Sequence, residues 1–425
     1  DDWVELIADD TQEFVGYDYT ETEVQITRYR RVSTKGKTLY QLVFNITPFY
    51  GESGGQVGDR GWLISETEKI NVLDTHKENG LTVHITDRLP EDLTQVFTAK
   101  VDLDKRVATE NNHTSTHLLH YALRKVLGTH VEQKGSYVSD EYLRFDFSHF
   151  QKVTDEELEK VAAIANQEIR KNYPLEESRA IPIGQAKKMG AMAIFGEKYG
   201  DLVRVVKFGE SVELCGGTHA HATGQIGFFK IISESSVSAG VRRIEAITAA
   251  KAEEYILNYF KMMKEIDSMF KSNRGVLENV RELLNENEGL RKDVEKFTQE
   301  SLRIMKEGWK NEKRVIRDIN MIVKTVMMSP ANVKDIAFQL KGELNNLILV
   351  IGGVFNNKPH LTVMFSDTLV KDFGLYAGQI VKDAAQEIKG GGGGQPFFAT
   401  AGGSNPEGVS KALERAEKLI LDKIH

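Results

Sequence analysis

The sequence predicts a multidomain α+β protein in which four regions of different pattern follow one another. A chain of 425 residues is long enough for about three domains of roughly 150 residues each. Short alternating stretches broken by glycines fill residues 1–90, helices and strands mix over 91–250, a charged helical pattern covers 251–320, and strands alternate with helices over 321–425. We therefore expect a small β-barrel, an α/β domain, a helical hairpin arm and a C-terminal α/β globular domain, in this order.

The composition is that of an ordinary folded protein without a membrane span. Hydrophobic residues make up 40% and charged residues 28% of the sequence. No apolar run is as long as the roughly 18 residues that a membrane-spanning helix needs. The single cysteine, Cys215, excludes an intramolecular disulfide and the zinc sites that need several cysteines. The net charge of −7 argues against indiscriminate nucleic-acid binding but allows a local basic face. The start, Asp1-Asp2-Trp3, has no signal-peptide pattern, so we expect a cytoplasmic protein that is part of a longer chain.

Residues 1–90 are assigned to the small barrel because short strands there alternate with glycine-rich turns. The segments around Val43 and Ile64 alternate between polar and apolar side chains, and glycines interrupt them. One stretch is basic and could contact phosphate, although a solvated hairpin is the simpler interpretation. This stretch contains Arg28, Arg30, Arg31, Lys35 and Lys37.

Residues 91–250 show the periodicities of both helices and strands, which predicts a mixed domain. Apolar residues at helical spacing alternate there with short segments of period two. Glycine or proline follows both predicted helices, as is common beyond helix ends. The predicted elements are helices over 107–127 and 156–171 and strands over 142–147, 202–208 and 226–232.

Residues 251–320 are expected to form two helices, because Asn273-Arg274-Gly275 interrupts an otherwise continuous helical pattern. The second helix has apolar residues at alternating spacings of 4 and 3, which is typical of coiled coils, with polar interruptions at Asn287 and Ser301. We favour packing within the molecule for this apolar stripe, with dimerisation through the arm as the alternative. The stripe consists of Val276, Val280, Leu283, Leu290, Val294, Phe297 and Ile304.

The last region, residues 321–425, has buried strands predicted over 347–351 and 361–365. Five consecutive glycines occupy positions 390–394, after a helix near Ala384, and a closing helix is predicted over about 406–424. The alternation of strands and helices favours an α/β unit.

Two short motifs indicate a metal site. His113 and His117 are four residues apart, so on a helix their imidazoles lie on one face and can share one ion. In Cys215-Gly-Gly-Thr-His219 the two glycines permit a tight turn that aims both side chains at one point. Cysteine and imidazole suit zinc, and three histidines with one cysteine complete a tetrahedral set.

The kind of zinc site stays open at this stage. Position 114 is Thr, so the glutamate base of His-Glu-x-x-His metalloproteases is missing. Four protein ligands normally form a closed structural site, whereas catalytic zinc keeps an open position. Either one ligand is loose or the ion becomes five-coordinate; His120 and His221 are interpreted as neighbours rather than ligands.

Three sets of motifs in this chain resemble the alanyl-tRNA synthetase family. One set resembles its editing domain, residues 47–59 resemble the preceding barrel, and 390–396 with 401–403 resemble its C-terminal domain. The resemblance spans nearly the whole chain in the right order, which makes it specific, although a phosphoesterase family shares the last domain type. The editing-domain segments are His113-Thr-Ser-Thr-His117-Leu-Leu-His, Gln133-Lys-Gly-Ser, Arg144-Phe-Asp-Phe, Phe195-Gly-Glu-Lys-Tyr-Gly-Asp, Glu213-Leu-Cys-Gly-Gly-Thr-His219 and Gly240-Val-Arg-Arg-Ile-Glu245.

This resemblance implies a zinc-dependent editing domain that hydrolyses tRNA(Ala) mischarged with serine or glycine, inside an enzyme that attaches alanine using ATP. It implies that the zinc ligands are His113, His117, Cys215 and His219, and that Gln133 is a pocket residue. It also implies a C-terminal region that binds tRNA(Ala), with a homodimer through that region as a further possibility. A freestanding editing protein, a tRNA-binding module with structural zinc, and a zinc peptidase are the alternatives, the last disfavoured by Thr114.

Selection of serine over alanine needs a polar partner for the serine hydroxyl, because alanine would leave that partner unpaired. Thr114 and Thr116, which flank the ligands, are the candidates, and we assign Thr116 with Gln133 to the catalytic group. In segment 142–147, Phe145 and Phe147 share one face, and Arg144 and Asp146 share the other. Arg144 and Asp146 are candidates for the substrate cleft, with an internal ion pair as the alternative.

Overall fold

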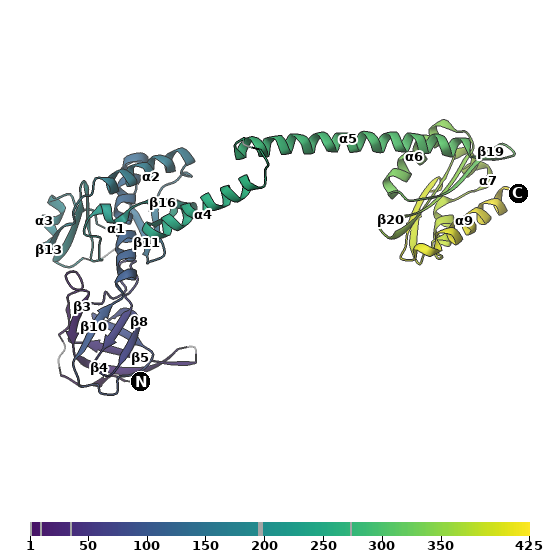
Figure 1. The fold of residues 1–425 in the computed structure, drawn as a ribbon. Coiled ribbons are helices and arrows are strands. Elements are labelled where there is room, and N and C mark those ends of the chain that lie inside the picture. Colours follow the sequence, from purple (N-terminus) through teal and green to yellow (C-terminus); the bar gives the residue numbers. More distant parts are fainter. Residues whose placement is uncertain (1, 9–10, 35, 194–198, 273) are drawn as a thin grey trace. The chain divides into compact units, whose positions relative to one another are not determined.

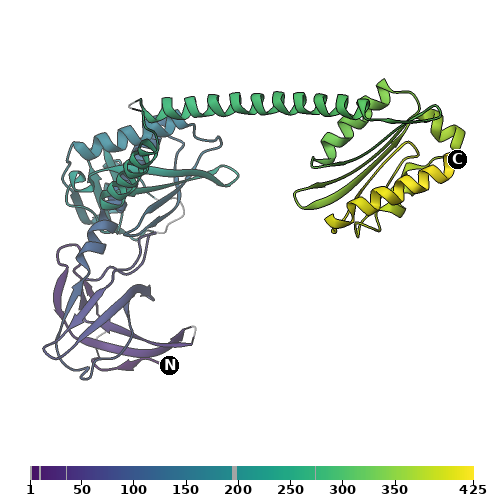
Figure 2. The ribbon, with the colours of Figure 1, turned by 45° about the vertical axis from the view of Figure 1, so that its right-hand side comes forward.

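The computed structural model describes residues 2–8, 11–34, 36–193, 199–272 and 274–425. Tertiary contacts divide the chain into two compact units, Asp1–Met269 and Phe270–His425 (Figures 1 and 2). Within the described ranges, no helix is both long and apolar enough to cross a membrane. The fold is mixed α+β, as predicted. Lys35, Phe195 to Lys198 and Asn273, which the sequence analysis used, lie outside the described residues.

The first unit begins with an eight-stranded antiparallel sheet. Its core consists of alternating apolar side chains such as Leu42, Phe44, Leu63 and Val72, all buried. The strand order is linear and ends at β1 and β3, so closure into the predicted barrel stays a prediction. A short parallel pair, β2 (Glu13–Phe14) and β6 (Ile46–Thr47), forms a separate two-stranded sheet that contacts β3. In spatial order the strands are β1 (Val4–Glu5), β4 (Ile26–Thr34), β5 (Lys37–Phe44), β9 (Leu81–Thr86), β8 (Lys69–Glu78), β7 (Gly61–Ile64), β10 (Phe97–Val101) and β3 (Glu21–Val24).

Helix α1 (Leu103–Leu127) follows the last of these strands directly and carries the first two predicted ligands. Asp102 caps its N-terminus by accepting a hydrogen bond from the Lys105 backbone N–H. The helix starts four residues before the predicted 107, because its first turn is held by this cap rather than by apolar periodicity. Gly128 ends it, as predicted.

Two smaller antiparallel sheets complete the first unit. Helices α1 and α2 (Asp155–Arg170) share a buried core with the first sheet, in which Phe145, Phe147 and Ile244 are fully buried. A short strand of the second sheet, β15, leads into the cysteine motif. The first sheet has the order β11 (Gln133–Val138), β12 (Leu143–Ser148), β17 (Val241–Thr248), β16 (Phe229–Ser238), and the second has β13 (Glu176–Pro182), β14 (Leu202–Phe208), β15 (Ser211–Leu214). The other elements are α3 (Ile183–Lys188), η1 (Thr223–Ile226) and α4 (Ala249–Ser268).

Strand β16 differs from the predicted strand over 226–232. Ile226 belongs to the 3-10 turn η1 and is fully buried in the core, so its apolar character reflects packing and not a strand.

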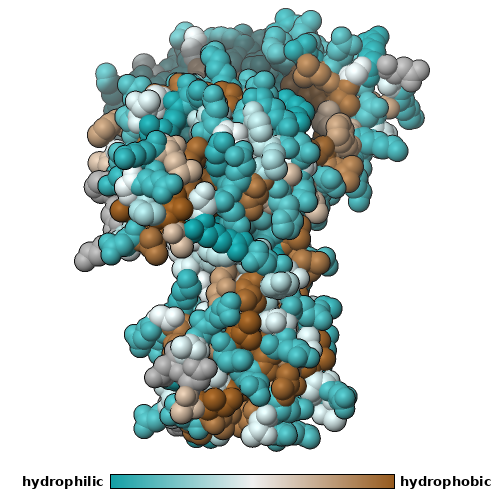
Figure 3. All heavy atoms as spheres, turned by 90° about the vertical axis from the view of Figure 1, so that its left-hand side faces the viewer, coloured by the Kyte–Doolittle hydropathy of each residue, from teal (hydrophilic) through white to brown (hydrophobic). Residues whose placement is uncertain are grey.

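Figure 3 shows that hydrophilic side chains cover most of the visible face of the molecule, with apolar residues gathered in smaller patches.

The second unit is a six-stranded sheet covered on both faces by helices. Alternate residues of β19 and β20 pack into two separate cores: Met321 and Ile348 face α8 and α9, whereas Ile322 and Leu349 face α6. Only β19 and β20 are parallel, since α6 crosses between them. The strand order is β18 (Arg314–Ile316), β19 (Ile319–Val326), β20 (Leu347–Phe355), β21 (Lys358–Phe365), β23 (Phe398–Gly402), β22 (Gly391–Gly394), and the helices are α5 (Val276–Asn311), α6 (Pro330–Glu343), α7 (Asp367–Phe373), α8 (Ala377–Ala384), η2 (Pro406–Gly408) and α9 (Val409–Ile424).

The five-glycine run contributes an entire edge strand, β22, and the lack of a side chain is required at alternate positions of this strand. A Cβ atom on Gly392 would lie 2.2 Å from the carbonyl oxygen of Thr400, and one on Gly394 would lie 2.4 Å from that of Phe398. Any other residue at these two positions would push β22 away from β23.

The apolar stripe of α5 is exposed over most of its length in the structure. The side chains of Leu290, Val294 and Phe297 are more than half exposed, whereas Leu302 and Trp309, which lie outside the stripe near the helix end, are buried against α6. Within the second unit, no described residue buries these three side chains, so the packing that we favoured for the stripe stays a prediction. Two helices are present, as predicted: α4 ends at Ser268 and α5 begins at Val276. Their arrangement as a hairpin stays a prediction.

Candidate metal centre

Four side chains from two distant segments meet at one point in the first unit. His113 and His117 lie one turn apart on α1, and Cys215 and His219 lie on the loop that follows β15. Their candidate ligand atoms all lie within 4.8 Å of one another. The three histidines are buried and Cys215 is half-buried. The structure thus brings together all four residues that the sequence predicts as metal ligands.

Hydrogen bonds leave one nitrogen of each imidazole available. His113 Nδ1 lies 2.7 Å from Gln56 Oε1, and His219 Nδ1 lies 3.1 Å from Thr114 Oγ1. The Nε2 atoms of these two rings lie 3.4 and 3.3 Å from Cys215 Sγ. The Nε2 atom of His117 lies 3.5 Å from Glu213 Oε2, and its Nδ1 atom is buried without a hydrogen-bond partner among the described residues.

Burial keeps these imidazoles neutral. It lowers the pKa of His113 and of His219 well below the usual value, and neighbouring histidines lower it further. Burial also lowers the pKa of His117, although the Glu213 carboxylate opposes this shift. Metals bind the neutral imidazole, so the three rings are in a form that can act as ligands at neutral pH.

The Cys215–His219 loop is fixed by groups that bind its backbone. Arg204 donates to the carbonyl oxygens of Cys215 (3.1 Å) and Gly217 (2.6 Å), and the Tyr17 hydroxyl donates to that of Gly216 (2.5 Å). A Cβ atom on Gly217 would lie 2.1 Å from His113 Cε1, so only glycine lets the loop approach α1 this closely. The backbone N–H of Gly217 also points to Cys215 Sγ at 3.4 Å, which favours a thiolate.

A cavity of about 240 Å³ opens beside the cluster. Its wall includes His113, His117 and Cys215 together with Gln133 and Thr116. Other lining groups include Tyr50 and Ser53 from the N-terminal region. The buried carboxylate of Glu213, which lies 2.9 Å from His120 Nδ1, also belongs to the wall. The cavity is large enough for an amino acid. Apolar side chains, hydroxyl groups and three of the candidate metal ligands all line it.

The predicted substrate residues take different positions. Gln133 and Thr116 line the cavity; the Gln133 amide donates to Ser136 Oγ, and the Thr116 hydroxyl donates to the Asn112 carbonyl oxygen on the preceding turn. Thr114 does not line it, because its hydroxyl binds His219 Nδ1 and the Ala220 N–H. Its place is behind the ligand, where it orients the ring.

Arg144 and Asp146 lie away from the cavity. Strand register puts Gln133 on the face of the sheet that carries Phe145 and Phe147, so Arg144 and Asp146 are on the opposite face. Asp146 accepts two hydrogen bonds from Arg243, at 2.7 and 2.8 Å. Asp146 therefore forms an internal ion pair, which was the alternative to a role in the substrate cleft.

Sequence reasoning did not single out Gln56, Glu213 or Tyr50. Gln56 and Tyr50 lie inside the segment 47–59, whose resemblance to the family was noted, and Glu213 is two residues before Cys215. The sequence analysis interpreted the glycines around Gln56 as turns between strands, and only the fold shows that Gln56 reaches the metal cluster.

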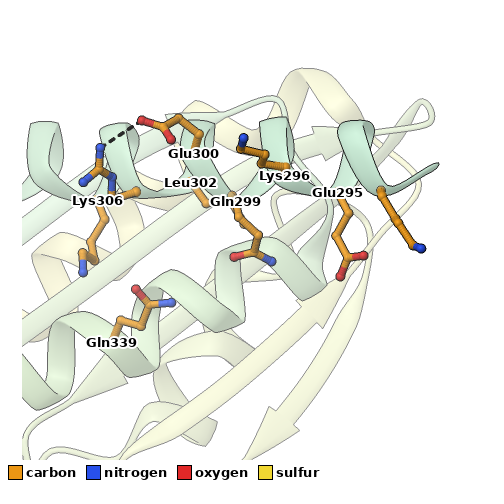
Figure 4. A pocket seen from close by; sticks show the side chains of 9 residues that line it. Glu295, Lys296, Gln299, Glu300, Leu302, Lys306 and Gln339 are labelled. Atoms are coloured by element: carbon orange, nitrogen blue, oxygen red, sulfur yellow. Dashed lines mark hydrogen bonds and ion pairs between the residues drawn. The ribbon is translucent and has the colours of Figure 1, made fainter. Parts of the chain in front are cut away.

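A second cavity, of about 640 Å³, lies between α5 and α6 in the other unit (Figure 4). Gln299 and Gln339 point into it from the two helices, and the remaining wall is mostly Lys, Arg and Glu. Arg303 pairs with Glu300, and Lys306 pairs with Glu343. No histidine or cysteine lines this cavity, so it offers none of the chemistry of the first.

Comparisons with known protein families match three parts of the chain. Residues 203–245 match the family described as the threonyl and alanyl tRNA synthetase second additional domain. Residues 3–107 match class II (A) tRNA synthetases, and residues 318–422 match the DHHA1 domain. The first match contains Cys215 and His219 but not the two histidines of α1.

Curated relatives match almost the whole chain. The alanine–tRNA ligase of Bacteroides fragilis is 55% identical over 98% of this chain, that of Parabacteroides distasonis 51% over 99%, and that of Porphyromonas gingivalis 47% over 97%. A solved structure, the C-Ala domain of Aquifex aeolicus alanyl-tRNA synthetase, covers 26% of this chain and 97% of its own at 17% identity, with a TM-score of 0.24 that is too low to support an argument. The chain spans about half the length of the curated relatives it matches, 48% for the first two. On this identity across nearly all of its residues, the chain belongs to the alanine–tRNA ligase family.

Proposed function

We propose that this chain hydrolyses the ester bond of tRNA(Ala) mischarged with serine or glycine, at a zinc ion held by His113, His117, Cys215 and His219. It would do so as the editing part of an enzyme that attaches alanine to tRNA(Ala) using ATP. The observation that carries the proposal is that three residues of the ligand cluster, His113, His117 and Cys215, line the same cavity as Gln133 and Thr116. Membership of the alanine–tRNA ligase family supports an aminoacyl-tRNA as the substrate.

The residues of the cluster fit zinc. Three neutral imidazoles and one cysteine are a donor set that zinc prefers, and the buried Nδ1 of His117 has no other partner in the described part of the chain. The hydrogen bonds that His113 and His219 make through Nδ1 leave Nε2 as the coordinating atom of each ring. Bound zinc would polarise the ester carbonyl or lower the pKa of a water molecule.

The protein's own groups would bind and orient the aminoacyl end. The Thr116 hydroxyl donates to Asn112, which leaves its oxygen able to accept a hydrogen bond from the serine hydroxyl. Gln133, held by Ser136, faces the same space. Tyr50 and Ser53 also line the cavity and would limit the size of the amino acid.

The second unit would hold the body of tRNA(Ala). Its residues 318–422 match the DHHA1 domain, and its resemblance to the C-terminal domain of the family supports a tRNA-binding role. A homodimer through this region is part of the same proposal, since the exposed apolar stripe of α5 offers a surface that association could cover.

Two alternatives share these observations. A freestanding editing protein would use the same site, and it differs only in what precedes the chain. A tRNA-binding module with structural zinc would hold the metal but hydrolyse nothing. The lining of the cavity by Cys215, itself half-buried, favours a metal that a substrate can reach.

The test compares seryl-tRNA(Ala) with alanyl-tRNA(Ala), each incubated with the protein before and after treatment with a zinc chelator. We expect hydrolysis of the seryl ester, little hydrolysis of the alanyl ester, and loss of activity after chelation. Equal and slow loss of both esters, at the rate without protein, would leave only the binding-module alternative.

A further inference from the structure

Gln56 lies in the N-terminal region, on the loop between β6 and β7, yet its side chain is fully buried against the metal cluster. All three hydrogen bonds of its amide end there. Oε1 lies 2.7 Å from His113 Nδ1 and accepts from the Thr218 backbone N–H at 3.0 Å. Nε2 donates to Thr218 Oγ1 at 2.9 Å. One amide therefore contacts both segments that carry the ligands.

The contact with Thr218 fixes the chemical roles in this network. A backbone N–H can only donate, so the amide atom that faces it must be the oxygen. Because that oxygen is also the partner of His113 Nδ1, the Nδ1 atom must carry the proton. The lone pair of His113 is then on Nε2, which lies 3.4 Å from Cys215 Sγ, on the metal side of the ring.

The backbone of the loop that carries Gln56 is attached to β11, the edge strand of the sheet β11-β12-β17-β16. Val57 N–H donates to the Val138 carbonyl at 3.0 Å, and Val138 N–H donates to that of Gly55 at 2.7 Å. Gly55 touches β11 so closely that a Cβ atom there would lie 2.5 Å from the Ser136 carbonyl oxygen. The position of Gln56 is therefore set by main-chain contacts and not by its side chain alone.

We propose that Gln56 is a positioning residue of the metal centre, which sets the tautomer of His113 and holds the Cys215–His219 loop against α1. The N-terminal region would thereby complete a centre whose ligands all lie beyond residue 112. This inference rests on the proposed zinc site. Groups that bind the second nitrogen of a ligating histidine typically change metal affinity about 10- to 100-fold when removed.

The experiment measures zinc affinity by competition with a chromophoric chelator, in the full chain. Gln56→Leu removes the acceptor and should weaken zinc binding about 10- to 100-fold. Gln56→Glu keeps an acceptor for both His113 Nδ1–H and Thr218 N–H and should restore affinity to within about threefold of the parent, as carboxylates commonly fill this role. Cobalt-substituted Gln56→Leu should also show a changed d–d spectrum, which a loss of stability alone would not produce.

Gln12→Leu is the matched control. Gln12 also makes three amide hydrogen bonds in the first unit, to Phe44 and Thr82, but contacts no ligand. The Gln12→Leu substitution should leave zinc affinity and the cobalt spectrum unchanged. Parental affinity in Gln56→Leu, or equal losses in Gln12→Leu and Gln56→Leu, would overturn the proposal.

A second measurement needs no variant. In the cadmium-113-substituted parent chain with nitrogen-15 histidine, the metal should couple to His113 Nε2, while Nδ1 should carry a proton. Coupling to Nδ1 would overturn the proposal even if Gln56→Leu does not fold. A parent chain that binds no zinc at all would instead contradict the proposed function, so the two failures are distinguishable.

Discussion

At the scale of single residues, hydrogen bonds behind the ligands decide which atoms of the cluster can bind a metal. Thr114 and Gln56 each occupy one nitrogen of a histidine, and Glu213 lies beside a third ring. The His-x-x-x-His and Cys-x-x-x-His spacings could be predicted from sequence because each is local, within one helical turn or one loop. Gln56 could not, because 57 residues separate it from its partner His113.

Thr116→Val tests the residue assigned to serine selection. Valine keeps the shape of threonine but cannot accept a hydrogen bond from serine, so the barrier for seryl-tRNA(Ala) hydrolysis should rise by about 1–3 kcal/mol. Alanyl-tRNA(Ala) hydrolysis and zinc content should stay constant. Thr114→Val is the comparison, because its hydroxyl faces His219: it should lower zinc affinity instead. An equal loss on both substrates in Thr116→Val would mean that Thr116 only supports the ligand helix.

The buried ring of His84 predicts an acid-sensitive N-terminal sheet. Burial lowers its pKa to about 3, although the Leu42 carbonyl opposes the shift, and in the unfolded chain the pKa is about 6.5. The unfolded state therefore binds the proton first, and stability falls as the pH drops below about 6.5. Between pH 7.5 and 5.5 this residue should remove about 1.4 kcal/mol of unfolding free energy. Over the same pH interval, the unfolding free energy of His84→Gln should fall by that much less than that of the parent, as measured by denaturant titration in the presence of a chelator. An identical pH dependence in the two proteins would show that His84 is not the source of the acid sensitivity.

At the scale of elements, α1 connects the N-terminal region of the first unit to the metal cluster. Its first turn holds the N-terminal sheet through Arg106, which is almost fully buried and donates to Asp59 and to the carbonyl oxygens of Gly16 and Pro48. Its middle carries His113 and His117. The apolar periodicity predicted this helix well, but not its first turn, where exposed Leu103 breaks the pattern and the Asp102 cap sets the start.

Arg106→Met should destabilise the first unit by about 3–5 kcal/mol, because it leaves the buried carboxylate of Asp59 without its cation. Adding Asp59→Asn should recover part of this loss, since the amide can still accept from the Tyr50 N–H without a buried charge. Thermal unfolding of the single and double variants measures both effects. A double variant that is as unstable as the sum of two independent losses would argue against a coupled pair.

At the scale of the whole molecule, the order of the regions could be predicted because each has its own periodicity and composition. Contacts between regions could not: the N-terminal region supplies Tyr17, Tyr50 and Gln56 to a centre whose ligands come from later residues. The coiled-coil spacing of α5 suggested packing, but spacing alone does not say what covers an apolar stripe. The described residues of the second unit leave most of the stripe exposed, and its packing stays a prediction.

Removing residues 270–425, the second compact unit, tests the division of labour. A chain that ends at Met269 should bind tRNA(Ala) more weakly, while its hydrolysis rate at saturating tRNA should change little. The lost part of the affinity should decrease with salt, because phosphate contacts release counterions. Filter binding at several salt concentrations measures this. Unchanged tRNA affinity would assign the second unit to dimerisation, which sedimentation of the two chains would reveal.

The most direct measurement of the central claim is the rate of seryl-tRNA(Ala) hydrolysis while zinc is returned stepwise to the chelated protein. The account predicts that the rate rises in proportion to bound zinc and levels off at one ion per chain. Cys215→Ala should bind little zinc and show little activity at the same additions, because it lacks one ligand and the metal site would not close. Full hydrolysis by the zinc-free protein, or by Cys215→Ala with normal zinc content, would contradict the account.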